Sequence, residues 1–337
     1  MKLALWHWHI EISSKCTLRC PRCAREEVPD TLVNTELRLE FFKRNFTPDF
    51  VREHVEKITF CGDDGDPIYA HDLIEVIQYI KSVKPVKFVI ITNGSYKKNG
   101  WWAQLGLALN HNDEIHFSLD GWDQTSNEQY RVNSDWESIV NGIRTLRTCS
   151  NVYMTWAAIA FKFNEEHLDK MRDMARELGF DRFQVTRSTK FNKIYPVYPE
   201  GDPLQPREQL ISNTHRFERD VENLHTRNPS AAGLETNLRL YEELKDYDGV
   251  KPLCSVGNKG LYINSLGRFF PCCWVANRYN HNSEWVELAK NFDLNEKTLT
   301  SVITDDFWSS DFEIFPWEEC RNKCNASVIN SDYATEW

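Results

Sequence analysis

Apolar residues in the first part of the chain fall into six short runs that are typical of buried β-strands. Longer segments separate them, with apolar residues every three or four positions, as in amphipathic helices. Strands alternating with helices predict a parallel sheet with right-handed crossovers, either an open doubly wound sheet or an incomplete βα barrel. The six runs span residues 6–13, 57–62, 86–94, 114–121, 152–161 and 182–188.

Two of the predicted helices carry capping signals. The helix between the fourth and fifth strands is expected to begin with a cap at Ser134 or Asp135, and Glu137 completes a capping box. The helix between the fifth and sixth strands is expected to begin at Asn164 and to end at Gly179, a residue suited to a helix C-terminus.

The pattern becomes less regular after the sixth strand. A proline-rich stretch at 195–209 resembles a linker, and helical stretches are predicted around 206–226 and 233–246. A hairpin is predicted within 259–273, with its turn at Asn264–Gly267. We therefore expect three parts, at residues 1–190, 191–249 and 250–337.

Composition restricts the class of protein. The chain has 337 residues, 41% of them hydrophobic, and a net charge of -10 without a dense Lys/Arg run, which disfavours nucleic-acid binding. No apolar run approaches the length of a membrane span. The N-terminus starts like a signal peptide, but His7, His9 and Glu11 interrupt the apolar run, so we expect a cytoplasmic protein. In a reducing compartment its ten cysteines indicate metal ligands or catalytic thiols rather than disulfides.

Polar, glycine-bearing and cysteine-bearing segments follow the predicted strands. In parallel sheets and βα barrels, ligands gather at the carboxyl ends of the strands. The sequence therefore predicts one binding edge. The segments on it are Cys16–Cys23, residues 62–67, Asn93 and Gly94, Ser118 to Gly121, and Arg187.

Cys16, Cys20 and Cys23 form an unusual set of three thiols after the first strand. A structural zinc site usually has four protein ligands, so zinc would need a fourth, such as His7 or His9. A [4Fe–4S] cluster normally takes four thiolates, and three leave one iron open to a small molecule.

The Cys16-x3-Cys20-x2-Cys23 motif after a first strand resembles the signature of the radical S-adenosylmethionine (SAM) superfamily. The resemblance implies that the amino and carboxylate groups of SAM chelate the open iron of a [4Fe–4S] cluster. An electron then cleaves SAM to a 5′-deoxyadenosyl radical that abstracts hydrogen. The family fold is a partial (β/α)6 barrel resembling a TIM barrel, in agreement with the six predicted strands.

The resemblance also implies a set of SAM-binding residues, although it names no catalytic side chain. Residues 65–67 resemble the family's Gly-Glu-Pro motif, whose backbone holds the SAM amino group. The chain departs from the family pattern at Arg22, where an aromatic residue is usual, and at Asp66, where Glu is commoner. The implied SAM-binding residues are Gly65, Asp66, Pro67, Asn93, Ser118, Asp120 and Arg131.

A second group of cysteines lies near the C-terminus. Cys254, twelve residues, Gly267, four residues and Cys272 resemble the opening of a SPASM/twitch extension, a small α+β unit that holds an auxiliary cluster. The resemblance implies an auxiliary [4Fe–4S] cluster on Cys254, Cys272, Cys320 and Cys324, with Cys273 as an alternative ligand. Structural zinc remains an alternative for these four cysteines.

The sequence thus predicts a radical SAM oxidoreductase or maturase that acts on a small molecule or on a peptide delivered by a separate protein. The auxiliary cluster would take up an electron, giving oxidation or bond formation, and a flavodoxin or ferredoxin would supply the reductant. One alternative is a nucleic-acid-modifying enzyme of the same superfamily, which the net charge of -10 disfavours. The other is a non-catalytic zinc protein, which would be colourless, whereas the enzyme would be brown with about eight irons per chain.

Overall fold

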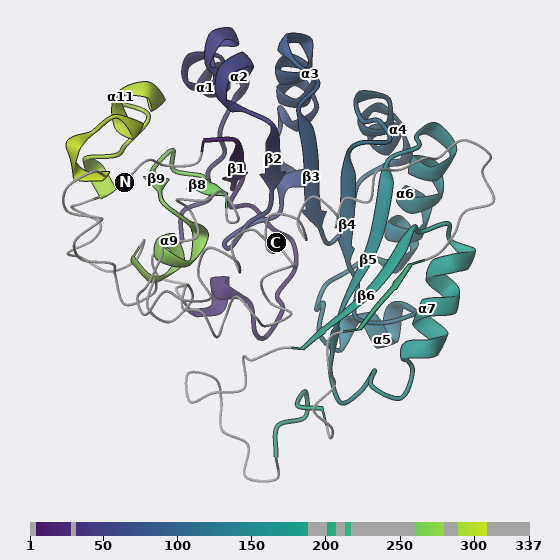
Figure 1. The fold of residues 1–337 in the computed structure, drawn as a ribbon. Helices are drawn as coiled ribbons and strands as arrows, with labels where there is room; N and C mark the ends of the chain where they lie inside the picture. Colours follow the sequence, from purple (N-terminus) through teal and green to yellow (C-terminus); the bar gives the residue numbers. More distant parts are fainter. Residues whose placement is uncertain are drawn as a thin grey trace, which may run out of the picture.

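A single nine-stranded sheet organises the computed structural model, which describes residues 5–27, 32–187, 201–206, 213–216, 260–279 and 289–308. The strand order is β7-β6-β5-β4-β3-β2-β1-β8-β9, and β1 to β6 are all parallel (Figure 1). The strands are β1 (His7–Ile10), β2 (Lys57–Phe60), β3 (Lys87–Thr92), β4 (Glu114–Ser118), β5 (Tyr153–Ala160), β6 (Arg182–Arg187), β7 (Asn213–Arg216), β8 (Leu261–Ile263) and β9 (Phe269–Phe270).

Helices connect the parallel strands and lie along the outer side of the sheet (Figure 1). The predicted α/β fold, an open partial barrel built on six parallel strands, is confirmed. No helix in the described ranges is long and apolar enough to cross a membrane. The α-helices are α1 (Leu39–Asn45), α2 (Pro48–His54), α3 (Leu73–Val83), α4 (Asn99–Ala108), α5 (Gln124–Glu128), α6 (Trp136–Cys149), α7 (Leu168–Glu177), α9 (Cys273–Tyr279) and α11 (Leu299–Ile303).

The two faces of the sheet differ in chemistry because side chains alternate along each strand. On the outer face, buried residues such as Phe60 and Phe88, stacked 5.7 Å apart, join the helices in one apolar core. The intervening positions include most of the polar residues of the strands, together with a few apolar ones such as Val89 and Ile159. This inner face carries His7, Lys57, Thr59, Lys87, Glu114, His116, Thr155, Arg182 and Gln184.

The N-cap of α6 is one of the two predicted residues, but the capping box of α6 and the start of α7 differ from the predictions. The N-cap of α6 is Asp135, which accepts a hydrogen bond from the Ser138 amide at 3.1 Å. The third helical position is therefore Ser138, and the predicted capping box with Glu137 is wrong. Helix α7 begins at Leu168 rather than at Asn164, because the Asn164 side chain bonds the ends of strands instead of the helix.

The helical stretch predicted at 206–226 is also wrong where it is described. Residues Asn213–Arg216 form β7, which pairs antiparallel with β6 in the register Arg182↔Arg216. The open edge of β6 offers unpaired backbone groups to this segment, and that tertiary pairing overrides local propensity. The predicted stretch at 233–246 lies outside the described residues.

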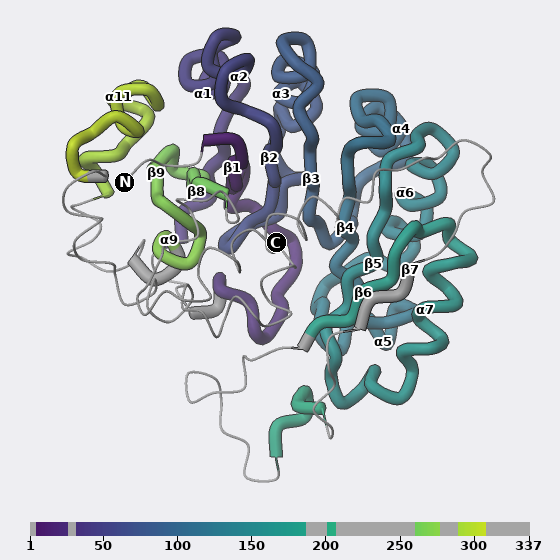
Figure 2. The backbone as a smooth tube through the Cα atoms, in the orientation of Figure 1, coloured from purple at the N-terminus to yellow at the C-terminus, as the bar shows by residue number. Residues whose placement is uncertain are grey.

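The predicted C-terminal hairpin is present as β8 and β9, with the Gly267 amide donating to the Asn264 carbonyl oxygen at 2.9 Å. Gly267 has φ +81°, a conformation that favours glycine. Strand β8 pairs in parallel with β1, so the hairpin continues the main sheet, and Figure 2 shows the two strands side by side. The hairpin leads directly into α9, which begins at Cys273.

Candidate active site

The three N-terminal cysteines lie on one loop between β1 and the first helices. Cys20 is buried, Cys16 and Cys23 are half-buried, and no disulfide joins them. The loop packs on an apolar cluster in which the rings of Tyr130 and Phe161 lie 4.3 Å apart. The apolar surroundings restrict water around the thiols.

The loop that follows α5 holds the cysteine loop from one side. The Arg19 amide donates to the Val132 carbonyl oxygen at 3.0 Å, and Asn133 Nδ2 donates to the Thr17 carbonyl oxygen at 2.7 Å. Burial raises the pKa of Cys20, and the nearby Arg131 guanidinium opposes this rise. The structure therefore brings a predicted SAM-binding residue, Arg131, to a predicted cluster ligand.

Asp66 ties the end of β3 to the loop after β2. Its carboxylate accepts hydrogen bonds from the Ile68 amide at 3.1 Å and the Thr92 hydroxyl at 2.8 Å. It also accepts from the Asn93 amide at 2.7 Å and from Asn93 Nδ2 at 2.6 Å. Asn93 Nδ2 in turn lies 3.7 Å from Cys16 Sγ. The Asp66 side chain is thus occupied by the protein, which leaves the backbone of this loop for a ligand.

Burial affects the charge of Asp66. Removal from water raises its pKa to about 6, although the hydrogen bonds from Asn93, Thr92 and Ile68 oppose the rise. All four donors point at the carboxylate oxygens, so the ionised form fits the site at neutral pH.

Gly65 lies where two backbone segments almost touch. A Cβ atom there would come within 1.9 Å of the Ser13 carbonyl oxygen, so no other residue fits. The Arg25 guanidinium donates to the carbonyl oxygens of both Ser14 and Asp64, which fastens the two segments together. Arg25 was not predicted from the sequence, because a lone arginine after a cysteine motif carries no distinctive signal.

Asp120 holds Arg131 at the end of β4. It is fully buried, and its carboxylate accepts from Arg131 Nε at 2.6 Å and from the Ile159 amide at 2.6 Å. Asn164 Nδ2 donates to the Asp120 carbonyl oxygen at 2.8 Å. Both oxygens of Asp120 are therefore engaged within the protein. Ser118 lies close by as the last residue of β4 and is half-buried.

Burial affects the charge of the cysteine thiols. Burial raises the pKa of Cys16 to about 12, with the Asp66 charge adding to it, and raises the pKa of Cys20 to about 11. Bound cations would be needed to make them thiolates. Within the described ranges, no three His, Cys, Asp or Glu side chains gather closely enough to hold one metal ion. A cubane cluster places its thiolates on separate irons, so its ligands need not converge.

Arg22, which stands where the family usually has an aromatic residue, is engaged within the protein. It is 3% exposed and forms an ion pair with Asp202. Asp202 lies in the short segment 201–206, which makes two further contacts. The Leu204 carbonyl oxygen accepts from the Lys162 amide at 3.1 Å, and the Leu204 side chain packs against the apolar cluster of the cysteine loop. Arg22 thus fastens residues 201–206, part of the predicted linker, over the loop.

The second group of cysteines is only partly described. Cys272 and Cys273 are half-buried and pack against a small cluster that includes Tyr262 and Phe270. Cys254, Cys320 and Cys324 lie outside the described residues. The predicted auxiliary cluster and its ligand set therefore stay predictions, as does the role of Arg187, whose side chain is outside the described set.

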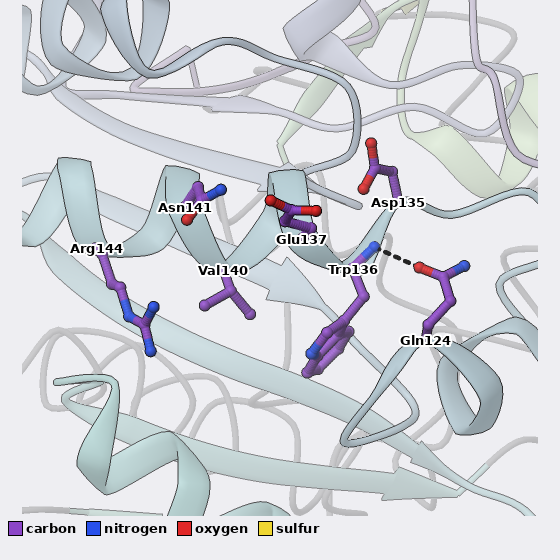
Figure 3. Close-up of a pocket in the computed structure, with 7 residues that line it drawn as sticks. All are labelled: Gln124, Asp135, Trp136, Glu137, Val140, Asn141 and Arg144. Atoms are coloured by element: carbon purple, nitrogen blue, oxygen red, sulfur yellow. Dashed lines mark hydrogen bonds between the residues drawn. The ribbon is translucent and has the colours of Figure 1, made fainter.

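A pocket of about 580 Å³ opens elsewhere, beside the first turns of α6 (Figure 3). The Trp136 amide donates to Gln124 Oε1 at 2.8 Å at its edge. No predicted site residue lines this pocket, so it is separate from the candidate active site. Its lining is Gln124, Asp135, Trp136, Glu137, Val140, Asn141 and Arg144.

No protein-family model matches the chain. In sequence it is 21% identical, over 333 residues, to the antilisterial bacteriocin subtilosin biosynthesis protein AlbA of Bacillus subtilis. The match covers 94% of this chain and 64% of AlbA, so the chain spans less than two thirds of that relative.

Two solved structures share the fold. Streptococcus suis SuiB, bound to its precursor peptide SuiA, aligns with a TM-score of 0.60 at 16% identity, covering 98% of this chain and 71% of SuiB. The protein anSMEcpe, with bound S-adenosylmethionine and a Cp18Cys peptide, aligns with a TM-score of 0.52 at 14% identity, covering 96% of this chain and 87% of that one. These likenesses in sequence and fold support the resemblance to the radical SAM superfamily, with a SPASM-type C-terminal region, that the cysteine motifs predicted.

Proposed function

We propose that this chain is a SAM-cleaving enzyme that modifies a peptide. The observation that carries the proposal is the convergence of the ends of β3 and β4 on the cysteine loop that follows β1. Asn93, after β3, reaches Cys16, and Arg131, anchored by Asp120 after β4, reaches Cys20. A metal site held only for structure would not need these polar groups beside its ligands.

Cys16, Cys20 and Cys23 would hold a [4Fe–4S] cluster, and when bound this cluster supplies the electron that cleaves SAM. The loop at Gly65–Pro67 would offer its backbone to the SAM amino group. The Arg131 guanidinium, which Asp120 keeps charged and oriented, would face the SAM carboxylate. The apolar cluster around Phe161 would exclude water from the reacting atoms.

One observation favours a peptide over a small molecule as substrate: SuiB and anSMEcpe, which share the fold, are both seen with peptides bound. A small molecule remains the second candidate.

We further propose that Cys254, Cys272, Cys320 and Cys324 hold a second cluster that accepts an electron from the substrate radical, making the reaction an oxidation or a bond formation. With four protein ligands, this cluster would carry electrons rather than bind substrate. An external one-electron reductant, such as a flavodoxin or ferredoxin, would serve the first cluster. These roles rest on the resemblance to the SPASM/twitch extension.

The deciding experiment is anaerobic reconstitution with iron, sulfide, SAM and a reductant, followed by assay of 5′-deoxyadenosine. The wild type should bind about eight irons and cleave SAM. Cys16→Ala should lose about four irons and all cleavage. Cys320→Ala should keep cleavage but lose product formation. Cys149→Ala is the matched control, because Cys149 is exposed at the end of α6 and should change nothing. A colourless, zinc-loaded protein would refute the proposal.

A further inference from the structure

A buried carboxylate joins the loop after β2 to the C-terminal hairpin. Glu11 follows β1 directly and is 1% exposed. Its Oε1 accepts hydrogen bonds from the Asp64 amide at 2.6 Å and from the Gly65 amide at 3.1 Å. Its Oε2 accepts from the Tyr262 hydroxyl at 3.1 Å. One side chain therefore bonds the predicted SAM loop with one oxygen and strand β8 with the other.

Tyr262 belongs to the hairpin region. It lies opposite His9 in the β1–β8 pairing, and its ring meets the His9 ring edge-on at 5.0 Å. Its ring also packs in the small apolar cluster against which Cys272 and Cys273 lie. Tyr262 is 1% exposed, so its hydroxyl acts within the protein.

The position of the loop leaves little tolerance. A Cβ atom on Gly62 would lie 2.6 Å from the Gly65 carbonyl oxygen, and one on Gly65 would lie 1.9 Å from the Ser13 carbonyl oxygen. Backbone segments this close shift together when one of them moves. The Glu11 carboxylate accepts a hydrogen bond from the Gly65 amide, at the point where the two backbone segments are closest. The orientation of Glu11 therefore sets the path of the Gly65 backbone.

The surroundings of Glu11 make its hydrogen bond from the Tyr262 hydroxyl important for holding its side chain in place. The carboxylates of Asp63 and Asp64 lie near enough to repel it, and no cation is among the groups that bond it in the described structure. The Tyr262 hydroxyl donates to the second oxygen of an otherwise crowded carboxylate. A buried carboxyl oxygen left without a hydrogen-bond partner is costly, so losing the Tyr262 hydroxyl should turn or release Glu11.

We propose that Glu11 and Tyr262 are positioning residues that fasten the SAM-binding loop to the C-terminal hairpin, so that SAM affinity depends on a hairpin side chain that does not contact SAM. This inference rests on the proposed function for the SAM site. It assigns the C-terminal region a part in SAM binding that is separate from electron transfer.

The test compares Tyr262→Phe with Phe270→Leu in the reconstituted full-length chain. Both changes fall in the same apolar cluster, but only the first removes the bond to Glu11. Tyr262→Phe should weaken SAM binding, measured by calorimetry without reductant, by roughly fivefold to tenfold. Phe270→Leu should leave the Kd unchanged despite lowering the Tm. The double variant Glu11→Gln/Tyr262→Phe should raise the Kd for SAM by less than the product of the fold-changes of the two single variants, because the two residues act as one unit.

Amide hydrogen exchange gives a second readout that does not need SAM. Tyr262→Phe should speed exchange at the Asp64 and Gly65 amides, which donate hydrogen bonds to Glu11, and Phe270→Leu should not. Equal effects of the two variants, unchanged exchange, or faster exchange with an unchanged Kd would each overturn the inference. If the wild type itself fails to bind SAM, the proposed function falls, while the exchange experiment still decides whether Tyr262 holds the loop.

Discussion

Two pairs of buried carboxylates, one pair at each end of the parallel strands, are held in different ways. At the carboxyl end, Glu11 and Asp66 accept hydrogen bonds from neutral donors, chiefly backbone amides, although Asp120 nearby pairs with Arg131. At the amino end, Glu114 pairs with Lys87, and Asp113 pairs with Lys81. The first arrangement fixes loops at the cost of unneutralised charge, while the second neutralises charge on the body of the barrel.

The pKa directions follow this division. Burial raises the pKa of Asp66 to about 6, and burial together with Asp64 and Asp63 raises the pKa of Glu11. Burial also opposes the charge of Glu114, but the hydrogen bond from His116 and the charge of Lys87 outweigh it and lower the pKa. In barrels of this kind the carboxyl end binds ligands and the opposite end contributes stability. The next experiments can break or sharpen this contrast.

The largest effect is expected from Gly65→Ala at the carboxyl end. The new methyl group would overlap the Ser13 carbonyl oxygen and force two backbone segments apart, so we expect loss of SAM binding and about 3 kcal/mol or more of stability. Calorimetry and a thermal melt measure the two effects. Gly100→Ala is the control: it lies in α4 with nothing within 4 Å, and should stabilise the protein by about 0.5–1 kcal/mol. A soluble Gly65→Ala protein with wild-type SAM affinity would contradict the site.

Asp66→Asn should have the next largest effect. Each carboxylate oxygen accepts two donors, so the amide nitrogen must face two hydrogens whichever way it is turned. We expect a loss of about 2–4 kcal/mol in the free energy of unfolding at pH 7, together with weaker SAM binding, because Asn93 loses its anchor beside Cys16. Urea unfolding and SAM titration measure these losses. Unchanged stability would mean that the carboxylate is protonated in the native protein.

Glu114→Gln should affect stability alone, by about 1–3 kcal/mol at neutral pH. The pKa of Glu114 is lowered in the folded protein, so its contribution is present above the unfolded pKa of about 4.3 and is lost as pH falls below that value. Unfolding curves of the wild type and the variant should therefore differ at pH 7 and converge in acid. If this substitution also weakened SAM binding as strongly as Asp66→Asn does, the contrast between the two ends would fail.

Most of the barrel could be predicted from the sequence because its signals are local. Each of the six strands is a compact apolar run, and Gly179, with φ +78°, follows α7 as its position predicted. The cysteine loop was equally accessible, since its three thiols lie within eight residues of one another. Local patterns could not predict which distant segments each residue contacts. Residues 213–216 form a strand because they pair with the edge of β6, and Asn164 does not cap α7 because its side chain bonds the backbone after β4.

The site shows the same limit. Asn93, Asp120 and Arg131 were expected to bind SAM. In the structure, Asn93 donates a hydrogen bond to Asp66, and Asp120 accepts hydrogen bonds from the Ile159 amide and from Arg131. Such pairings depend on distances across the fold and leave no trace in spacing along the chain. Glu11 was noticed only as an interruption of an apolar run, although it bonds both the loop after β2 and Tyr262. The SAM-contact roles of these residues stay predictions.

The pairing of β8 with β1 has a consequence for how the chain is made. Strand β1 leaves the ribosome long before β8. Strand β2 can cover one edge of β1 soon afterwards, but the other edge waits for Leu261–Ile263. Until then an apolar strand with unpaired amides stays available to neighbouring chains, a state that favours aggregation. Slow synthesis or heavy overexpression should therefore yield insoluble protein, and helper chaperones that shield nascent strands should raise the yield.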